Sequence, residues 1–352
     1  MDKKGFLLTL VTFLLIAGGL SFAQNKEEGR VVTIGKIKAL PGETASGFLE
    51  VAGGNFPDTK IPISIINGSQ SGPVLALTAG VHPYEYPPIE ALLRVKAQLN
   101  PKKLKGTLLL VHIANLQAFQ KRTIYYNPYD WLNLNRVFPG DPNGSVSQRI
   151  AHTITQEIIK RCDYLIDLHC GDGNESLIPY SYWSKGGDSE VDEFSRKMVE
   201  AFGIYPIIES QRPQDTKATI YVDNTAIQMG KPAFTTESGQ LGSLDEESVQ
   251  LLLRGVDNVL KFLKMIEGEI KDFGPPTYIK KFEVIRSNHD GIFYPLTKRG
   301  YYVNKGQPIG YITDYFGNKL ETIFSPFTGQ ILYIVATPPA NKGEPLVEVG
   351  EF

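Results

Sequence analysis

The chain has 352 residues, of which 42% are hydrophobic and 21% charged, and its formal net charge is −2 at pH 7. This is the composition of a folded globular protein, and the length suffices for two domains. Because no basic run or acidic tail stands out, electrostatics gives no reason to expect a nucleic-acid partner.

Residues 1–23 have the features of a secretory signal peptide. Lys3 and Lys4 precede an apolar stretch, and small residues lie before the expected cleavage after Ala23. The alternative is a membrane anchor, but a spanning helix needs about 20 apolar residues and this run is shorter. We therefore expect export, in a bacterium to the periplasm, and no stable membrane span after cleavage.

Residues 24–272 alternate between short apolar runs typical of buried strands and amphipathic runs typical of helices. Strands are predicted over 74–79, 107–113, 163–169 and 232–236, and helices over 87–99, 146–158 and 244–266. This alternation predicts an α/β fold in which helices flank the sheet.

The character of the sequence changes near residue 273. Gly274-Pro275-Pro276 reads as a linker, and short β-type runs separated by glycine-containing turns follow it to the end of the chain. Residues 273–352 are therefore predicted to form a small all-β domain.

Two cysteines, Cys162 and Cys170, flank the predicted strand 163–169. A strand of that length separates its ends by roughly 20 Å or more, at about 3.3 Å per residue. A disulfide needs Cα atoms within about 7 Å of each other. Both are therefore predicted to be buried, reduced thiols.

A metal site is suggested by histidines and a glutamate placed just after strands. His82 and Glu85 stand three residues apart after the first buried strand, and His169 ends another. Ligands bind outside the carboxyl ends of the strands in such sheets. Two histidines and one carboxylate form the open ligand set of a catalytic zinc, which leaves a position for water.

Two acidic residues extend this pattern. Asp167 lies on the same strand face as His169 and could accept a hydrogen bond from its second ring nitrogen. Glu237 ends another predicted strand before a glycine turn. Zinc hydrolysis needs a carboxylate near the metal to take a proton from water, and Glu237 fits that role.

Arginines supply candidate groups for binding a carboxylate. The block Asn133-Leu134-Asn135-Arg136 contains one, and Arg122 lies upstream. The planar guanidinium group binds a carboxylate through two parallel hydrogen bonds.

Together these segments resemble the succinylglutamate desuccinylase/aspartoacylase family, a branch of the zinc carboxypeptidase superfamily. The H-x-x-E, N-L-N-R-x-F-P-G, D-x-H and T-E-x-G motifs occur in the family's order between about Val31 and Ile270, and the set is far more specific than any one motif. The resemblance implies a zinc carboxypeptidase-like mixed sheet and one Zn²⁺ held by His82, Glu85 and His169.

The same resemblance implies roles for the remaining residues. Glu237 is expected to be the general base, and Arg122 to polarise the scissile carbonyl. Asn135 and Arg136 are expected to hold the substrate carboxylate, with Asn133 beside them at a position where the family's best-known members have aspartate.

The C-terminal region is similar to biotinyl/lipoyl-type barrels, on the glycine-rich segments 300–310 and 325–329. No lysine stands at the hairpin position that such carriers modify. We therefore expect this domain to have a structural or lid role rather than to carry a swinging arm.

The expected activity is hydrolysis of an amide next to a carboxylate, as in the deacylation of a small N-acyl amino acid. One alternative is an exported metallo-carboxypeptidase or amidase acting on peptides such as cell-wall fragments, which would need an open groove rather than a pocket closed by the β-domain. Another is a non-catalytic periplasmic metal-dependent binding protein. Glu237 argues against it, because a pure binder needs no base.

Overall fold

The computed structural model describes residues 29–211 and 221–352. The predicted signal peptide lies outside these residues. None of the helices in the described ranges is long and apolar enough to cross a membrane.

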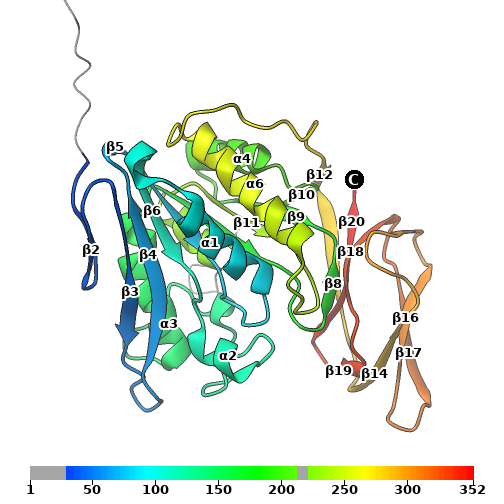
Figure 1. The fold of residues 1–352 in the computed structure, drawn as a ribbon. Coiled ribbons are helices and arrows are strands. Elements are labelled where there is room, and N and C mark those ends of the chain that lie inside the picture. The colour runs from blue at the N-terminus through cyan, green and yellow to red at the C-terminus, as the bar shows by residue number, and fades with distance from the viewer. Residues whose placement is uncertain (1–28, 212–220) are drawn as a thin grey trace, which may run out of the picture.

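A nine-stranded sheet forms the centre of the molecule, in the order β12-β10-β9-β11-β7-β5-β6-β4-β3 (Figure 1). Its middle strands β11, β7, β5 and β6 run parallel, while β9 is antiparallel to β11 and β4 to β6, so the sheet is mixed. The strands are β3 (Glu43–Val51), β4 (Thr59–Asn67), β5 (Gln70–Thr78), β6 (Lys105–Val111), β7 (Tyr164–His169), β9 (Tyr180–Lys185), β10 (Ile207–Gln211), β11 (Ala233–Glu237) and β12 (Tyr278–Ile279).

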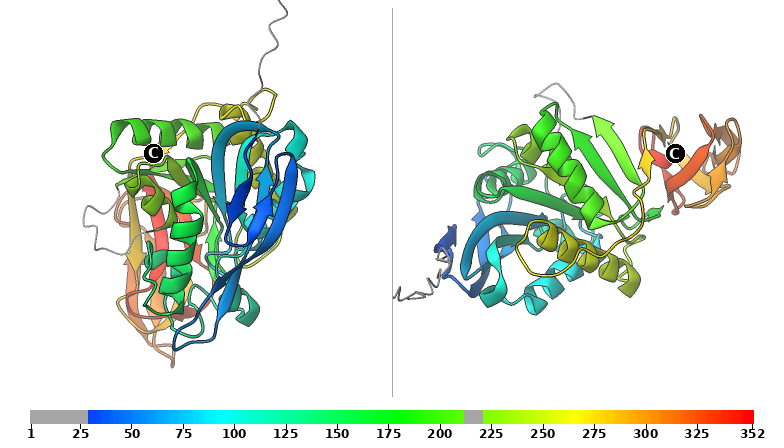
Figure 2. Two further views of the ribbon diagram at one scale, coloured as in Figure 1. Left: turned by 90° about the vertical axis from the view of Figure 1, so that its left-hand side faces the viewer. Right: turned by 90° about the horizontal axis from the view of Figure 1, so that it is seen from above.

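Helices cover both faces of this sheet (Figure 2). The apolar side chains of α1 (Tyr86–Gln98), α4 (Ser189–Phe202) and α6 (Glu246–Phe262) pack in one hydrophobic cluster, and those of α3 (Val146–Glu157) and α5 (Val222–Gln228) in another. Alternate residues of each central strand join opposite clusters; Leu75 and Leu77 pack under α1, whereas Ala76 faces α3. This is the predicted α/β architecture.

Every strand and helix predicted for residues 74–266 is present, with boundaries shifted by a few residues. The sequence did not indicate the antiparallel pair β3 and β4, the hairpin β1 (Val32–Ile34) and β2 (Ile37–Ala39), or the elements between β7 and α5. Cys162 and Cys170 are buried and free, as predicted.

The C-terminal region consists of two antiparallel sheets. One contains β13 (Lys281–Arg286), β20 (Pro345–Glu351), β18 (Gly329–Val335) and β15 (Tyr302–Val303), and the other β17 (Lys319–Phe324), β16 (Pro308–Thr313), β14 (Gly291–Pro295) and β19 (Pro339–Ala340). The prediction of an all-β region is confirmed. Within the described residues the sheets do not close into a barrel, so that part of the prediction is corrected. The physical reason lies at the edge of β18, where a strand from the preceding region takes the place next to β15.

That strand is β8 (Glu175–Leu177), which pairs antiparallel with β18. In exchange β12, which follows the linker, pairs with β10 at the edge of the central sheet. Leu177, Tyr180 and Ile208 share one hydrophobic cluster with the C-terminal strands. The predicted boundary near residue 272 is therefore crossed by strand pairing in both directions, and the β-domain is held firmly against the catalytic region.

Candidate active site

The sheet topology brings the predicted site residues together at the carboxyl ends of three adjacent strands. Strand β7 lies between β5 and β11, and its register places His169 beside Glu237 and Asp167 beside Thr78. The turn after β5 carries His82 and Glu85 to the same edge, and Glu85 is the residue that immediately precedes α1.

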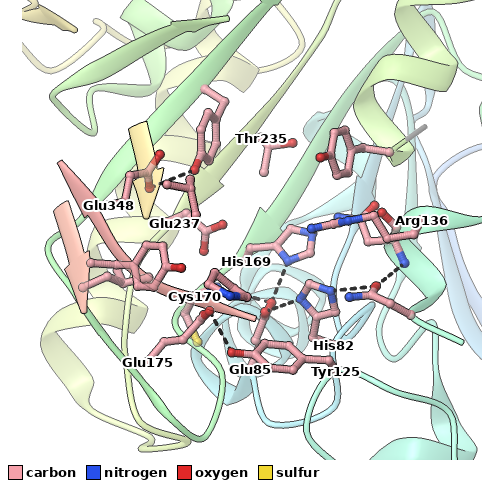
Figure 3. A pocket seen from close by; sticks show the side chains of 18 of the residues that line it. His82, Glu85, Tyr125, Arg136, His169, Cys170, Glu175, Thr235, Glu237 and Glu348 are labelled. Atoms are coloured by element: carbon pink, nitrogen blue, oxygen red, sulfur yellow. Dashed lines mark hydrogen bonds and ion pairs between the residues drawn. The ribbon is translucent and has the colours of Figure 1, made fainter. Parts of the chain in front are cut away.

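His82, Glu85 and His169 form a compact cluster (Figure 3). Nδ1 of His82 lies 2.6 Å from one carboxylate oxygen of Glu85, and Nδ1 of His169 lies 2.7 Å from the other. One ligand atom from each residue can be chosen so that all three lie within 4.8 Å of one another. All three side chains are at most 12% exposed.

The second ring nitrogen of each histidine faces an acceptor. Nε2 of His82 lies 3.2 Å from Oδ1 of Asn133, which also accepts from the backbone N–H of Asn135, and Nε2 of His169 lies 2.8 Å from Oδ2 of Asp167. Because these oxygens only accept, the Nε2 atoms carry the protons. Both Nδ1 lone pairs then point at a carboxylate, an arrangement that a bound cation would stabilise.

This donor set fits a catalytic zinc site, since two imidazole nitrogens and one carboxylate leave a coordination position open. Burial alone would raise the pKa of Glu85, but the neighbouring His169 and His82 outweigh it and hold that pKa at about 2. Glu85 is therefore ionised at neutral pH, as a metal ligand must be.

Glu237 lies beside this cluster with an oxygen free to react. Its Oε2 atom is buried and has no hydrogen-bond partner among the described residues. Burial raises the pKa of Glu237 well above its usual range, although the nearby His169 partly opposes the shift. A carboxylate of raised pKa accepts protons readily, as a general base requires.

Asn135 and Arg136 lie on another side of the same cavity (Figure 3). Nδ2 of Asn135 is 3.5 Å from Nε2 of His169, and its Oδ1 accepts from the backbone N–H of Val222. The Arg136 guanidinium lies over the ring of Tyr221, 4.6 Å from its centroid, and stays exposed on its other sides. It is thus available to an anionic group.

The structure places two predicted site residues differently from the others. Arg122 follows α2 (Leu116–Lys121) with a φ of 57°, and its exposed side chain does not line the cavity. Its assignment to the scissile carbonyl therefore remains a prediction. Asn133 lines the cavity, but its side-chain oxygen is occupied by His82 and Asn135. It holds His82 in place.

The cavity that contains these groups has a volume of about 690 Å³ and is lined by both regions of the chain. The β-domain supplies Tyr333 and Glu348, and β9 supplies Tyr180 and Tyr182. None of these four was identified from the sequence. A weak signal existed, since Glu348 is a lone carboxylate among apolar residues of a strand, and Tyr180 and Tyr182 alternate on one strand face.

Comparisons with known proteins agree with this geometry. The model of the succinylglutamate desuccinylase/aspartoacylase catalytic domain matches residues 71–263. The chain belongs to this family. It is 31% identical over 278 residues to the N-alpha-acetyl-L-2,4-diaminobutyric acid deacetylase of Halomonas elongata, an alignment that covers 76% of this chain and 79% of the relative. The family resemblance predicted from the sequence is thereby confirmed, and the chain is placed among amide-hydrolysing enzymes.

Solved structures share the whole fold. The ectoine utilization protein EutE of Ruegeria pomeroyi, in its product-bound form, superposes with a TM-score of 0.79 at 22% identity and covers 93% of this chain and 100% of that one. A succinylglutamate desuccinylase from Silicibacter sp. TM1040 superposes with a TM-score of 0.77 at 22% identity, covering 92% and 99%. The coverage extends the likeness to the β-domain.

Proposed function

We propose that the protein is an exported, zinc-dependent deacylase that hydrolyses the amide bond of a small N-acyl amino acid. The observation that carries the proposal is the pair of Nδ1 atoms of His82 and His169, which converge on the carboxylate of Glu85 while their Nε2 atoms are engaged. This geometry suits a metal ligand set better than a hydrogen-bonded cluster, because neutral imidazoles present lone pairs there.

The groups of the chain divide the chemistry between them. His82, Glu85 and His169 would hold the zinc ion, which when bound supplies a Lewis acid and acidifies water. Glu237 accepts a proton from the attacking water as the water oxygen bonds to the carbonyl carbon. It then delivers that proton to the leaving nitrogen as the carbon–nitrogen bond breaks, giving a carboxylate and a free amine.

Substrate orientation falls to the other side of the cavity. Arg136 can form paired hydrogen bonds with a substrate carboxylate, and Asn135, buried against His169, can contribute a further polar contact. Holding the substrate by its carboxylate fixes the amide relative to Glu237, which converts an encounter of two molecules into an oriented reaction.

A small substrate is favoured over a peptide because the β-domain contributes to the cavity wall through Tyr333 and Glu348. The Halomonas relative, named as a deacetylase of an Nα-acetylated amino acid, supports the same substrate class. Export rests on the predicted signal peptide alone.

The proposal is tested on full-length protein reconstituted with zinc, by metal analysis and by a hydrolysis screen of N-acetyl amino acids and short peptides. We expect about one zinc ion per chain and release of acetate from N-acetyl amino acids. His169→Ala should lose the metal, and His289→Ala, which changes a histidine of the β-domain, should retain it. Wild-type protein without zinc after reconstitution, or zinc-loaded protein that cleaves peptides only, would contradict the proposal.

A further inference from the structure

Glu348 is a buried carboxylate that the proposed chemistry does not use. It lies on β20, is 1% exposed and lines the active-site cavity from the side of the β-domain (Figure 3). Its Oε1 atom has no hydrogen-bond partner among the described residues. An unpartnered buried carboxylate oxygen is costly, so its retention at this position calls for a partner that arrives with the ligand.

The surroundings of Glu348 are rich in phenol groups and contain no cation in contact. Its Oε2 atom accepts long hydrogen bonds from the hydroxyls of Tyr182, at 3.4 Å, and Tyr180, at 3.5 Å. Tyr333 is its register partner on β18, and the Tyr333 hydroxyl is also buried without a partner in the described structure. Two oxygens with unused hydrogen-bonding capacity therefore come from adjacent strands.

The basic residues that line the cavity are engaged elsewhere. Arg286 is exposed and donates to the backbone carbonyl of Gly343, and Arg136 lies over Tyr221. Within the described ranges neither forms an ion pair with Glu348. Burial raises the pKa of Glu348 to about 8, which is the expected state of a carboxyl group that has not met its cation.

We infer that Glu348 and Tyr333 bind a second, unacylated amino group of the substrate, so that the protein acts on N-acyl diamino acids. An ammonium group offers three donors, which suit the Glu348 carboxylate and the Tyr333 hydroxyl, and the faces of nearby tyrosine rings attract a cation. This inference rests on the proposed deacylase function and makes the β-domain the part of the chain that selects the substrate.

The two ends of the cavity then complement the two ends of such a molecule. Arg136 lies on one side of the histidines, and Glu348 lies near Glu237 on another (Figure 3). A substrate with a carboxylate and an ammonium group would be held at both, with its amide near the cluster of His82, Glu85 and His169. A neutral side chain would leave the oxygens of Glu348 and Tyr333 unpaired, which lowers its affinity.

The test compares matched substrates on zinc-loaded, full-length protein. Nα-acetyl-2,4-diaminobutyrate and Nα-acetylornithine carry the free amine, and N-acetyl-2-aminobutyrate and N-acetylnorvaline have the same carbon chains without it. We expect kcat/KM to favour the diamino compounds by about tenfold or more, the size of one charged hydrogen bond. Glu348→Gln should remove that preference, mainly through KM, and leave the neutral substrates unchanged.

Two further variants guard against a purely structural effect. Tyr333→Phe removes only a hydroxyl and should weaken the same preference to a smaller extent. Glu283→Gln removes an exposed carboxylate on the neighbouring β13 and should leave every substrate unaffected. Equal losses for charged and neutral substrates in Glu348→Gln, or a wild-type enzyme without preference, would overturn the inference while the deacylase proposal stands.

A binding measurement separates this inference from the activity. Calorimetry should show 2,4-diaminobutyrate binding the zinc-loaded protein more tightly than 2-aminobutyrate, and Glu348→Gln should abolish the difference. If no N-acetyl amino acid is cleaved, the deacylase proposal fails, and this binding difference alone then supports or refutes the ammonium subsite.

Discussion

Asp167 accepts a hydrogen bond from Nε2 of His169 at 2.8 Å and another from the hydroxyl of Thr78 at 2.5 Å, so a fully buried carboxylate sets the orientation of one candidate metal ligand. Asp167→Asn can place its NH₂ group toward His169 and so favour the wrong tautomer. We expect zinc affinity to fall about 10- to 100-fold. Competition with a chelator measures it, and Asp163→Asn, on a nearby carboxylate outside the cavity, serves as the control.

Asn133 performs the matching task for His82 through its side-chain oxygen. Asn133→Asp keeps an acceptor at this position and should retain zinc with an affinity at least as high as the wild type. Asn133→Leu removes the acceptor and should weaken zinc binding by about tenfold or more. Equal affinities for the two variants in the chelator assay would show that Asn133 does not position His82.

Glu237→Gln tests the assignment of the general base. The amide keeps the size and shape of the side chain but cannot accept the proton, so kcat should fall by a factor of about 10² to 10⁴ while zinc content stays at the wild-type level. Steady-state kinetics and metal analysis on the same preparation check both parts. A variant that hydrolyses substrate at the wild-type rate would refute the mechanism.

Arg136→Lys tests recognition of the substrate carboxylate. Lysine preserves the charge but loses the paired geometry and the stacking on Tyr221. We expect KM to rise by about tenfold with a smaller change in kcat. Arg149→Lys, outside the active-site cavity, is the matched control. An unchanged KM would place the carboxylate site elsewhere.

The buried carboxyl of Glu348 should make stability depend on pH. Burial raises its pKa from 4.5 to about 8, an effect that the hydroxyls of Tyr182 and Tyr180 partly oppose and the carboxyl of Glu175 on β8 reinforces. Because the folded-state pKa is the higher one, its contribution to stability is complete below about pH 4.5 and is lost as the pH rises through about 8.

Glu348→Gln should therefore flatten the pH profile of the free energy of unfolding between these two values, by up to about 1.4 kcal/mol per pH unit. Denaturant unfolding of the metal-free protein at a series of pH values measures this slope. Glu283→Gln should reproduce the wild-type profile, and a Glu348→Gln profile parallel to the wild type would refute the assignment.

The sequence predicted the candidate metal cluster well because its three residues follow directly from strand ends. Once β5 and β7 are recognised as neighbouring buried strands, His82, Glu85 and His169 must meet at one edge. Asn133 was grouped with the substrate-binding residues because its motif adjoins Arg136, but the short 3₁₀ turn at Leu134–Arg136 directs its oxygen back to His82.

Glu348 could not be predicted in the same way. Its position in the cavity depends on the pairing of β8 with β18, two segments far apart in the chain that carry no shared motif. The alternating pattern of β20 identifies a strand but does not say what its faces meet. Arg122 shows the reverse case, since the family pattern assigns it a role while its side chain stays in solvent.

The exchange of strands between the two regions has a consequence for how specificity can change over evolutionary time. β8 completes a sheet of the β-domain, and β12 completes the central sheet, so neither region keeps its edges paired without the other. A chain shortened at residue 272 would expose the apolar seam around Leu177 and Ile208. New substrate preferences should therefore arise by point substitutions on β18 and β20, not by replacing the module as a whole.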